Sequence, residues 1–499
     1  MPAKRATRTL RDVTHRHVSA PGLRPRDVAA YAASYTGPQG TWMSIGGPDV
    51  TVLPVHLLPV LRGQADLERA RAEGAVYGLT TGVGALRHVP VPDGVGTGER
   101  ALRLWRSHAA GIGPELDDGL AGATMLVRLH QLLQGGSGAG PSLVEALAAA
   151  VASGAVPRLH RWGGIGTGDL TVLSELALTL VGELPWRSGS APVADIADGD
   201  ALPFISSNAM TIALGSLAVT RLGRLARAAE QVSALSHLAL RGSVQAYDAR
   251  VHAAKDDPAA SGVAARLSAL LDADARPSAR VQDPFGLRAI PQVHSPLEEA
   301  LEIAERALTA EIGASTENPL AVQGRALHHG QFVTQRLAAT LDAARAAVAP
   351  AMTLSVARLS ALLDPALSGL RPFLAEGPPA SSGLMIVEYV ASDLMAQVRT
   401  ATAPVTSVRT VVSLGLEEHA SHSTQAAWAV QDLVDLVPDL LACELVAAVR
   451  ALRFDPERLV DCPARELFDI AAAHLPDVRP DHILGPELTA AAEIVRALA

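Results

Sequence analysis

Apolar residues recur along much of this chain at the spacing of amphipathic helices. Three such stripes are marked by Leu170, Leu173, Leu176, Ala177 and Leu180, by Leu297, Leu301, Ala304 and Leu308, and by Leu337, Leu341, Ala344 and Val348. Steps of three and four residues place these side chains on one face of a helix. The sequence shows neither a regular alternation of strands with helices nor a fixed internal repeat. The pattern therefore predicts a mainly α fold, a bundle of long helices joined by loops.

Prolines and an aspartate mark the expected starts and breaks of these helices. Helices are predicted at 54–73 and from about Pro141, because proline is favoured in the first turn. Asp169 is expected to cap the helix of the first stripe. Pro350 lies inside the third stripe, and Pro438 lies inside another apolar stretch. Proline removes a backbone donor and clashes with the preceding turn, so each is expected to kink or split its helix.

The same patterns divide the chain into four segments. An N-terminal segment, 1–75, contains a Gly/Pro-rich patch at 37–48 and leads into the first motif. It is followed by a loop-rich region at 76–225, a central helical bundle at 226–455 and C-terminal helices at 456–499. Three of the stretches that carry chemistry, at 76–84, 107–113 and 164–170, fall in the loop-rich region.

Composition excludes several classes of function. The 499 residues include 42 Lys and Arg against 51 Asp and Glu, spread along the chain, so no basic face for nucleic acid is expected. Two cysteines, Cys443 and Cys462, are too few for a disulfide framework or a thiolate metal site. His419 and His422 lack a third ligand, so no metal site is expected. Without an apolar run of bilayer length, we expect a cytoplasmic protein with no membrane partner.

Tyr77 lies in the sequence VYGLTTGVG, where three glycines and two threonines predict a loop after a helix. A phenol has an ordinary pKa of roughly 10 and is a poor base. A catalytic role would therefore need nearby positive charge or helix N-termini that favour the phenolate. The alternative is a Gly-rich surface loop with a buried tyrosine.

Two further stretches are ambiguous when they are taken alone. Ser107 and His108 lie in SHAAGIG, where a histidine beside small residues is most often a hydrogen-bonded structural group. Gly166, Thr167 and Gly168 lie in GIGTGDL, which is a glycine-flanked turn before a helix. Neither stretch establishes a function by itself.

Together these motifs resemble those of the histidine and phenylalanine ammonia-lyases. The resemblance runs from about Tyr77 to Ser423, through VYGLTTGVG, SHAAGIG, GIGTGDL, VQDPFGLRAIPQV, TENPL, HGQFVTQRLA, SSGLMIVEYVASDL and GLEEHASHS. It implies the long-helix bundle of that family, with the active-site motifs in the loop-rich N-terminal region. It also implies a homotetramer whose active sites are each built from three subunits. The implied activity is base-assisted elimination from a histidine-type or aromatic α-amino acid, or a related carboxylate, to an α,β-unsaturated acid.

The resemblance also implies roles for single residues. Tyr77 matches the family's base, and Glu417 matches a glutamate close to the cofactor. The residues implied to bind the substrate are Ser107, His108, Gln282, Phe285, Arg288 and Phe332. Arg288 suits a carboxylate because its planar fork donates two charge-assisted hydrogen bonds at once. Two alternatives stay open, in which Phe332 is a core aromatic residue and Glu417 lies on a solvated helix face.

The cofactor motif departs from the family. In the family an Ala-Ser-Gly tripeptide cyclises and loses two waters, giving the electrophile 4-methylideneimidazole-5-one (MIO). Here the tripeptide is Gly166-Thr167-Gly168. Gly166 still supplies a carbonyl and Gly168 an unhindered nitrogen. Thr167 would leave a methyl group on the exocyclic alkene, which makes the alkene more hindered and less electrophilic. Three alternatives for the cofactor therefore stay open: MIO, its methyl-substituted form, or no cofactor.

Two other positions differ from the family. If Met210 and Thr211 set the alignment, Ile205 stands where the family has its catalytic asparagine. The nearby Ser206, Ser207 or Asn208 are candidate replacements. The alternative is that they cap the start of a helix, as serine and asparagine often do. Phe285 replaces a family tyrosine, so a phenol is lost there.

Three hypotheses follow for the function. The first is an ammonia-lyase that acts on an amino acid or related carboxylate. The second keeps the pocket but catalyses an elimination, isomerisation or addition without MIO, and it is favoured by the joint changes at Thr167, Ile205 and Phe285. The third is a non-catalytic protein that binds a small molecule or another subunit.

Overall fold

The computed structural model describes residues 22–35, 52–92, 98–272 and 278–499. The predicted Gly/Pro-rich patch at 37–48 lies outside these residues. The chain divides into two compact units, each assembled from three separate stretches. The first unit comprises Met1–Leu217, Glu305–Ala339 and Val405–Ala427, and the second comprises Ala218–Ala304, Thr340–Pro404 and Trp428–Ala499.

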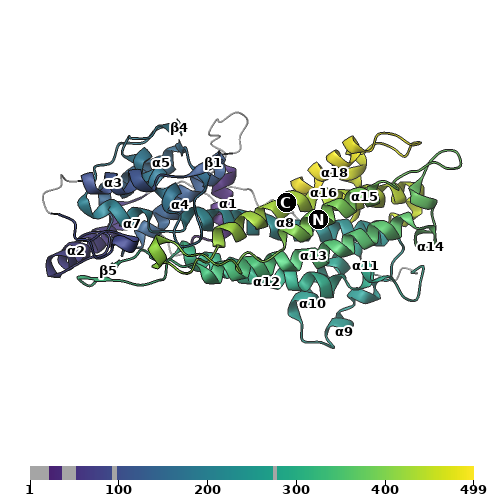
Figure 1. Cartoon of the computed structure of the whole chain (residues 1–499). Coiled ribbons are helices and arrows are strands. Elements are labelled where there is room, and N and C mark those ends of the chain that lie inside the picture. The colour runs from purple at the N-terminus through teal and green to yellow at the C-terminus, as the bar shows by residue number, and fades with distance from the viewer. Residues whose placement is uncertain (1–21, 36–51, 93–97, 273–277) are drawn as a thin grey trace, which may run out of the picture. The chain divides into compact units, whose positions relative to one another are not determined.

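The first unit is mainly helical (Figure 1). Its helices are α1 (Pro25–Ala33), α2 (Leu58–Glu73), α3 (Glu99–His108), α4 (Asp118–Leu133), α5 (Pro141–Ser153), α6 (Leu170–Leu180) and α7 (Ala201–Ile205). Three antiparallel strand pairs are short: β1 (Ile112–Glu115) with β3 (His160–Trp162), β2 (Val156–Pro157) with β4 (Trp186–Ser188), and β5 (Leu320–Val322) with β6 (Arg325–Leu327). The predicted helix at 54–73 begins as a 3-10 turn at Pro54–Leu57, and α5 begins at Pro141 as predicted.

Helix α4 forms the centre of the first unit. Every residue from Gly119 to Leu133 is buried, so the helix is covered on all sides. It packs against α1 and α5. Helix α6 is buried from Val172 to Leu180 and packs against α3 and α7. A helix covered all round needs little polar surface, which explains the Ala- and Leu-rich composition of this region.

Helices also dominate the second unit. Its shorter helices are α9 (Ala249–His252), α10 (Pro258–Leu271), α11 (Phe285–Arg288), α14 (Pro365–Ser368), α15 (Val387–Ala401), α17 (Arg465–His474) and α18 (Gly485–Leu498). The long helices α8 (Ala209–Ala239), α12 (Ile290–Ile312), α13 (Gln335–Leu363) and α16 (Ser423–Phe454) contain residues of both units. The prediction of a mainly α fold of long helices is confirmed.

The two prolines that were expected to kink or split their helices do not split them, and a kink at either proline stays a prediction. Pro350 lies inside α13 and Pro438 lies inside α16, and both helices continue past them. Val348 and Ala351 on either side of Pro350 are each 1% exposed. Burial of the flanking residues outweighs the lost backbone hydrogen bond, because tertiary packing supplies most of a helix's stability.

Two helical stretches have the length and apolar composition of a membrane span. They are Asp198–Ala239 and Gln335–Leu363. In their most apolar windows, 94% and 50% of the residues are buried inside the structure. Buried core helices share this composition, so these stretches do not by themselves indicate a membrane.

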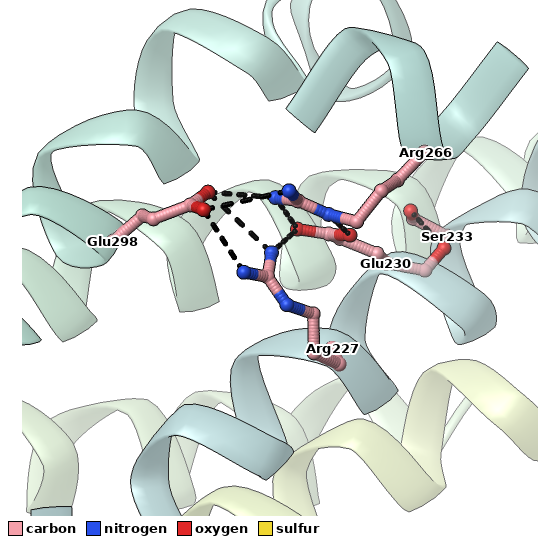
Figure 2. Close-up of polar contacts among 5 residues, drawn as sticks. All are labelled: Arg227, Glu230, Ser233, Arg266 and Glu298. Carbon is pink, nitrogen blue, oxygen red and sulfur yellow. Dashed lines mark hydrogen bonds and ion pairs between the residues drawn. The ribbon is translucent and has the colours of Figure 1, made fainter. Parts of the chain in front are cut away.

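An ion cluster joins three helices of the second unit (Figure 2). It consists of Arg227 and Glu230 on α8, Arg266 on α10 and Glu298 on α12. Arg266 Nε lies 2.8 Å from Glu230 Oε2, and its Nη2 lies 2.6 Å from Glu298 Oε2. Burial acts to raise the pKa of Glu298, but hydrogen bonds from the two arginines outweigh burial and lower that pKa.

A second polar group in the same unit is buried completely. Arg358 and Glu444 are 1% and 0% exposed and form two hydrogen bonds, of 2.6 and 2.9 Å. Ser236 and Ser355 each donate to the Glu444 carboxylate, and Arg358 Nη1 donates to the Gly286 carbonyl at 3.0 Å. These contacts join α8, α11, α13 and α16 and satisfy both buried charges.

Candidate active site

A cavity of about 520 Å³ lies in the first unit. Four residues to which the family resemblance assigns a role line it: Tyr77, Thr167, Phe332 and Glu417. They come from four segments that are far apart along the chain. The fold therefore brings the tyrosine loop, the Gly-Thr-Gly turn and the two C-terminal motifs to one place.

The cavity also contains polar residues that the sequence analysis missed. They are Thr81, Arg87, His88, Asn318 and His328. Thr81 lies within the tyrosine loop, and Arg87 and His88 come shortly after it. Asn318 lies within TENPL, and His328 directly precedes HGQFVTQRLA. Proximity to a recognised motif was the only signal that would have pointed to them.

Tyr77 is held at both its backbone and its phenol. Its backbone N–H donates to His328 Nε2 at 3.2 Å, and its hydroxyl oxygen accepts the Gly84 N–H at 2.7 Å. Gly78 and Gly84 have φ of +70° and +57°, a region that glycine adopts without strain. The glycines of VYGLTTGVG thus let the loop curl around the tyrosine.

The electrostatic surroundings of Tyr77 favour its neutral form. Burial raises the pKa of the phenol, and the negative charge of Glu417 raises it further. The Gly84 N–H and Arg87 act in the opposite direction but do not reverse the shift. The positive surroundings that the sequence analysis required for a phenolate are therefore outweighed within this unit.

The Gly-Thr-Gly turn relies on both of its glycines. Gly166 has a φ of +81° and Gly168 a φ of +120°. The helix α6 begins at Leu170, directly after Asp169. The expectation that Asp169 caps this helix through its side chain is wrong. The carboxylate instead accepts hydrogen bonds from Thr211 N at 2.8 Å and Thr211 Oγ1 at 2.9 Å, at the start of α8.

Three buried hydroxyls lie beside the carbonyl oxygen of Gly166, and two of them donate to it. Ser421 Oγ donates to this oxygen at 2.8 Å and Thr334 Oγ1 at 3.2 Å. Ser423 Oγ lies 2.7 Å from Thr334 Oγ1. We call Thr334, Ser421 and Ser423 the hydroxyl cluster. A Cβ atom on Gly166 would collide with Ser421 Oγ and lie 2.6 Å from Ser423 Oγ, so the cluster fits glycine at this position.

Asn208 holds the other end of the turn. Its Oδ1 accepts the Gly168 N–H at 3.0 Å, and its Nδ2 donates to the Phe332 carbonyl at 2.7 Å. Ile205 is fully buried in the core, whereas Ser206 lines the cavity. Of the candidate replacements for the family asparagine, Asn208 is the one that contacts the turn.

These contacts show whether the residues around the turn are compatible with a ring formed from the tripeptide. Such a ring joins the Gly168 nitrogen to the Gly166 carbonyl carbon. Both groups are free of a Cβ atom, and each is hydrogen-bonded to a buried side chain. Thr167 between them lines the cavity. The residues present therefore fit a precursor of the methyl-substituted ring.

Glu417 does not lie on a helix. It forms an isolated bridge with Val412, whose N–H donates to the Glu417 carbonyl at 2.9 Å. The alternative of a solvated helix face is therefore wrong. A residue in a loop that lines the cavity is free to present its carboxylate to a bound ligand.

Ser107 and His108 bond to their own helix. Ser107 Oγ donates to the Leu104 carbonyl at 2.8 Å, and His108 Nδ1 lies 2.9 Å from the same oxygen. Neither residue lines the cavity within the described part of the chain. These contacts are those of a helix C-terminus, and substrate recognition by the pair stays a prediction.

Gln282, Phe285 and Arg288 belong to the second unit. The guanidinium carbon of Arg288 lies 4.3 Å from the centre of the Phe285 ring, and its Nε donates to the Asp283 carbonyl at 2.7 Å. Phe285 is 65% exposed, and Gln282 is also exposed. These residues thus form a surface group, in which Arg288 retains further donors for a ligand.

Comparison with known proteins places the chain in a family. Residues 46–468 match the family described as "Aromatic amino acid lyase". The histidine ammonia-lyase of Geobacillus thermodenitrificans is 33% identical over 455 residues, which cover 86% of this chain and 90% of that protein. The crystal structure of histidine ammonia-lyase from Trypanosoma cruzi has a TM-score of 0.84 at 25% identity and covers 97% of this chain and 94% of that one. Ergothionase from Treponema denticola shares the fold, with a TM-score of 0.89 at 20% identity, covering 97% and 99%. The chain therefore belongs to the aromatic amino acid lyase family and is a carbon–nitrogen lyase of the ammonia-lyase type.

Proposed function

We propose that this lyase removes ammonia from an α-amino acid with an imidazole or aromatic side chain and releases the α,β-unsaturated acid. The observation that carries the proposal is the meeting of Tyr77, Thr167, Phe332 and Glu417 in one cavity. The 33% identity to a histidine ammonia-lyase supports an amino acid of the histidine type as the first substrate to test.

The chemistry needs a base and an activated leaving group. The β-hydrogen of an amino acid is weakly acidic and ammonium leaves poorly. In the proposal, Tyr77 takes the β-proton. Since its pKa is raised in the first unit, the proposal requires added positive charge near the phenol in the complete site. The ammonium group of the substrate supplies one such charge.

The proposed lyase reaction also needs an electrophile, for which the Gly-Thr-Gly turn is the candidate source. A ring formed from Gly166-Thr167-Gly168 would supply an electrophile for the substrate amine. Thr167 would leave a methyl group on the exocyclic alkene of that ring, and added atoms in a packed site cost roughly 1 to 3 kcal/mol. We therefore expect weak ammonia-lyase activity on histidine, phenylalanine and tyrosine.

The complete site is proposed to form in a homotetramer in the cytoplasm. The resemblance implies active sites built from three subunits. The exposed Gln282 and Phe285 and the half-buried Arg288 are suited to join the cavity of another copy. Arg288 would then hold the substrate carboxylate through two charge-assisted hydrogen bonds. A monomer observed by light scattering at micromolar concentration would contradict this assembly.

The function is tested by incubating the full-length protein with histidine, phenylalanine or tyrosine. Ammonia and the conjugated acid, which absorbs in the near ultraviolet, are both measured. We expect slow release from the wild type and none from Tyr77→Phe, with unchanged helical content by circular dichroism. Near-normal turnover in Tyr77→Phe would show that the base is another group.

A second candidate function is elimination, isomerisation or addition without the ring. The full burial of Ile205, at the position of the family's catalytic asparagine, favours it. Intact mass separates the two candidates. A deficit of two waters supports the ring-dependent lyase, and an unmodified chain that still converts a carboxylate substrate supports the second candidate.

A further inference from the structure

The hydroxyl cluster is a concentrated group of buried polar atoms beside the cavity. Ser421 and Ser423 are 0% exposed and Thr334 is 1% exposed. A buried hydroxyl is unfavourable unless it is hydrogen-bonded. Here the hydrogen bonds of two hydroxyls converge on the Gly166 carbonyl oxygen, and the Thr334 N–H approaches the same oxygen at 3.4 Å.

The direction of these hydrogen bonds follows from the acceptor. A carbonyl oxygen only accepts, so Ser421 and Thr334 must donate to it. Thr334 has one hydroxyl proton, and it donates that proton to the Gly166 carbonyl oxygen. In the 2.7 Å contact between Ser423 Oγ and Thr334 Oγ1, Ser423 is therefore the donor. Hydrogen bonds in series polarise one another. The Gly166 carbonyl is therefore held in an arrangement that stabilises negative charge on its oxygen.

Asn208 contacts the Gly168 nitrogen, which is the other atom of the bond that would close the ring. The orientation of its amide is fixed because the Phe332 carbonyl accepts and must therefore face Nδ2. Oδ1 then faces the Gly168 N–H. An acceptor at this N–H stabilises the positive charge that develops on the nitrogen when it attacks a carbonyl.

We propose that Ser421, Thr334 and Asn208 activate Gly166-Thr167-Gly168 for self-cyclisation, so that the turn is a modification site built by this chain's own residues. This inference rests on the proposed function and deepens it, because it names the groups that make the electrophile. The hydroxyls polarise the Gly166 carbonyl, and Asn208 assists the Gly168 nitrogen. Gly166 completes the site because any Cβ there would displace the hydroxyl cluster.

The reaction balances without a co-reactant. The Gly168 nitrogen bonds to the Gly166 carbonyl carbon and gives up its proton, and the carbonyl oxygen becomes a hydroxyl. This hydroxyl leaves with the N–H proton of Thr167 as the first water, and a C=N bond forms. Thr167 then loses its Cα hydrogen and its hydroxyl as the second water. The Cα=Cβ bond that results carries the threonine methyl group, and no atom is oxidised or reduced overall.

The test is the intact mass of the full-length chain, followed over time after pulse synthesis, with peptide mapping of the turn. We expect the wild type to lose two waters at residues 166–168. Ser421→Ala and Thr334→Val should each slow the loss about a hundredfold, as removal of one donor from an oxyanion-stabilising site does. Asn208→Leu should slow it as well.

Three variants serve as matched controls. Thr334→Ser keeps the hydroxyl and should keep the rate. Ser423→Ala removes only the outer hydroxyl and should have a smaller effect than Ser421→Ala. Thr167→Ala keeps the cyclising groups but has no hydroxyl to lose, so it should lose one water. Circular dichroism of each variant checks that the helical fold is retained.

The outcomes separate this inference from the proposed function. An unmodified wild type, or wild-type rates in folded Ser421→Ala and Thr334→Val, would overturn the inference. An unmodified chain that still releases ammonia would overturn the inference and leave the lyase function standing. A chain that forms the ring as expected but converts none of the three amino acids would keep the inference and overturn the proposed substrates.

Discussion

The polar centres of the two units are built from different chemistry. In the first unit, neutral hydroxyls and an amide surround a glycine turn beside the cavity. In the second unit, arginines and glutamates form the ion cluster and the Arg358–Glu444 pair between long helices. Buried ion pairs fix geometry strongly because either charge alone is very unfavourable. Neutral hydroxyls polarise a backbone carbonyl without that penalty, which suits the self-cyclisation proposed for this turn.

The same contrast extends to the buried titratable residues of each unit. Asp169 beside the turn has its pKa raised to about 6, mainly by burial, against the hydrogen bonds from Thr211. His294 on α12 has its pKa lowered to about 3, by burial and by the positive charges of Arg358 and Arg266. Both side chains are held neutral by the fold at a pH where the free side chain would be charged. Their effects on stability therefore have opposite dependence on pH.

The largest expected effect concerns His294 in the second unit. Neither of its ring nitrogens has a hydrogen-bond partner among the described residues. The pKa of His294 is lowered from 6.5 to about 3 in the folded protein. The unfolded chain therefore binds the proton at a higher pH than the folded protein does, and the fold loses stability as the pH falls through this range. The loss is about 4 kcal/mol at pH 3. Chemical denaturation of His294→Leu from pH 7 to pH 4 should show a much flatter decline than that of the wild type. Parallel declines would refute the assignment.

The next effect concerns the buried ion pair. Glu444→Gln leaves the Arg358 charge without its partner and should destabilise the fold by about 3 to 5 kcal/mol. The measurement is the midpoint of urea unfolding at neutral pH. The double variant Arg358→Met/Glu444→Leu removes both charges and should recover most of the loss. If Glu444→Gln lowers the urea midpoint less than the double variant does, the ion pair does not stabilise the second unit as described.

In the first unit, the stability contributed by Asp169 depends on pH in the opposite direction to that of His294. The folded pKa of Asp169 is raised, so its contribution to stability is full below the ordinary value of 3.8 and is lost as the pH rises through about 6. The change amounts to about 3 kcal/mol. Asp169→Asn should remove this decline, so the stability of the variant relative to the wild type should rise between pH 4 and pH 7. A constant difference over that range would show that the carboxylate titrates near its ordinary pKa.

The smallest expected effect sharpens the role of the hydroxyl cluster. Gly166→Ala forces a Cβ against Ser421 and Ser423 and should cost about 1 to 3 kcal/mol of stability. Gly166→Ala/Thr167→Ser, which recreates the family tripeptide, should therefore form the ring more slowly than the wild type. Adding Ser421→Ala and Ser423→Ala should relieve the strain, giving a favourable coupling in a double-mutant cycle. Additive effects measured by unfolding and by intact mass would show that the serines do not contact the new methyl group.

The local features of this protein follow from its sequence. Helical spacing predicted the long helices, Pro141 marked the start of α5, and the Gly-rich stretches predicted the loop of Tyr77 and the turn at 166–168. The family motifs pointed to four segments that line one cavity in the fold. These signals suffice because backbone preferences and side-chain periodicity act within a few residues along the chain.

The tertiary structure decided how the distant groups meet. Asp169 bonds to Thr211 instead of capping α6, and Pro350 is retained inside α13 by burial on both sides. Hydroxyls more than 160 residues away in sequence surround the Gly166 carbonyl. No local pattern encodes such contacts, because serine, threonine and aspartate have several partners of similar strength nearby. Which partner is used depends on what the packed helices bury beside them.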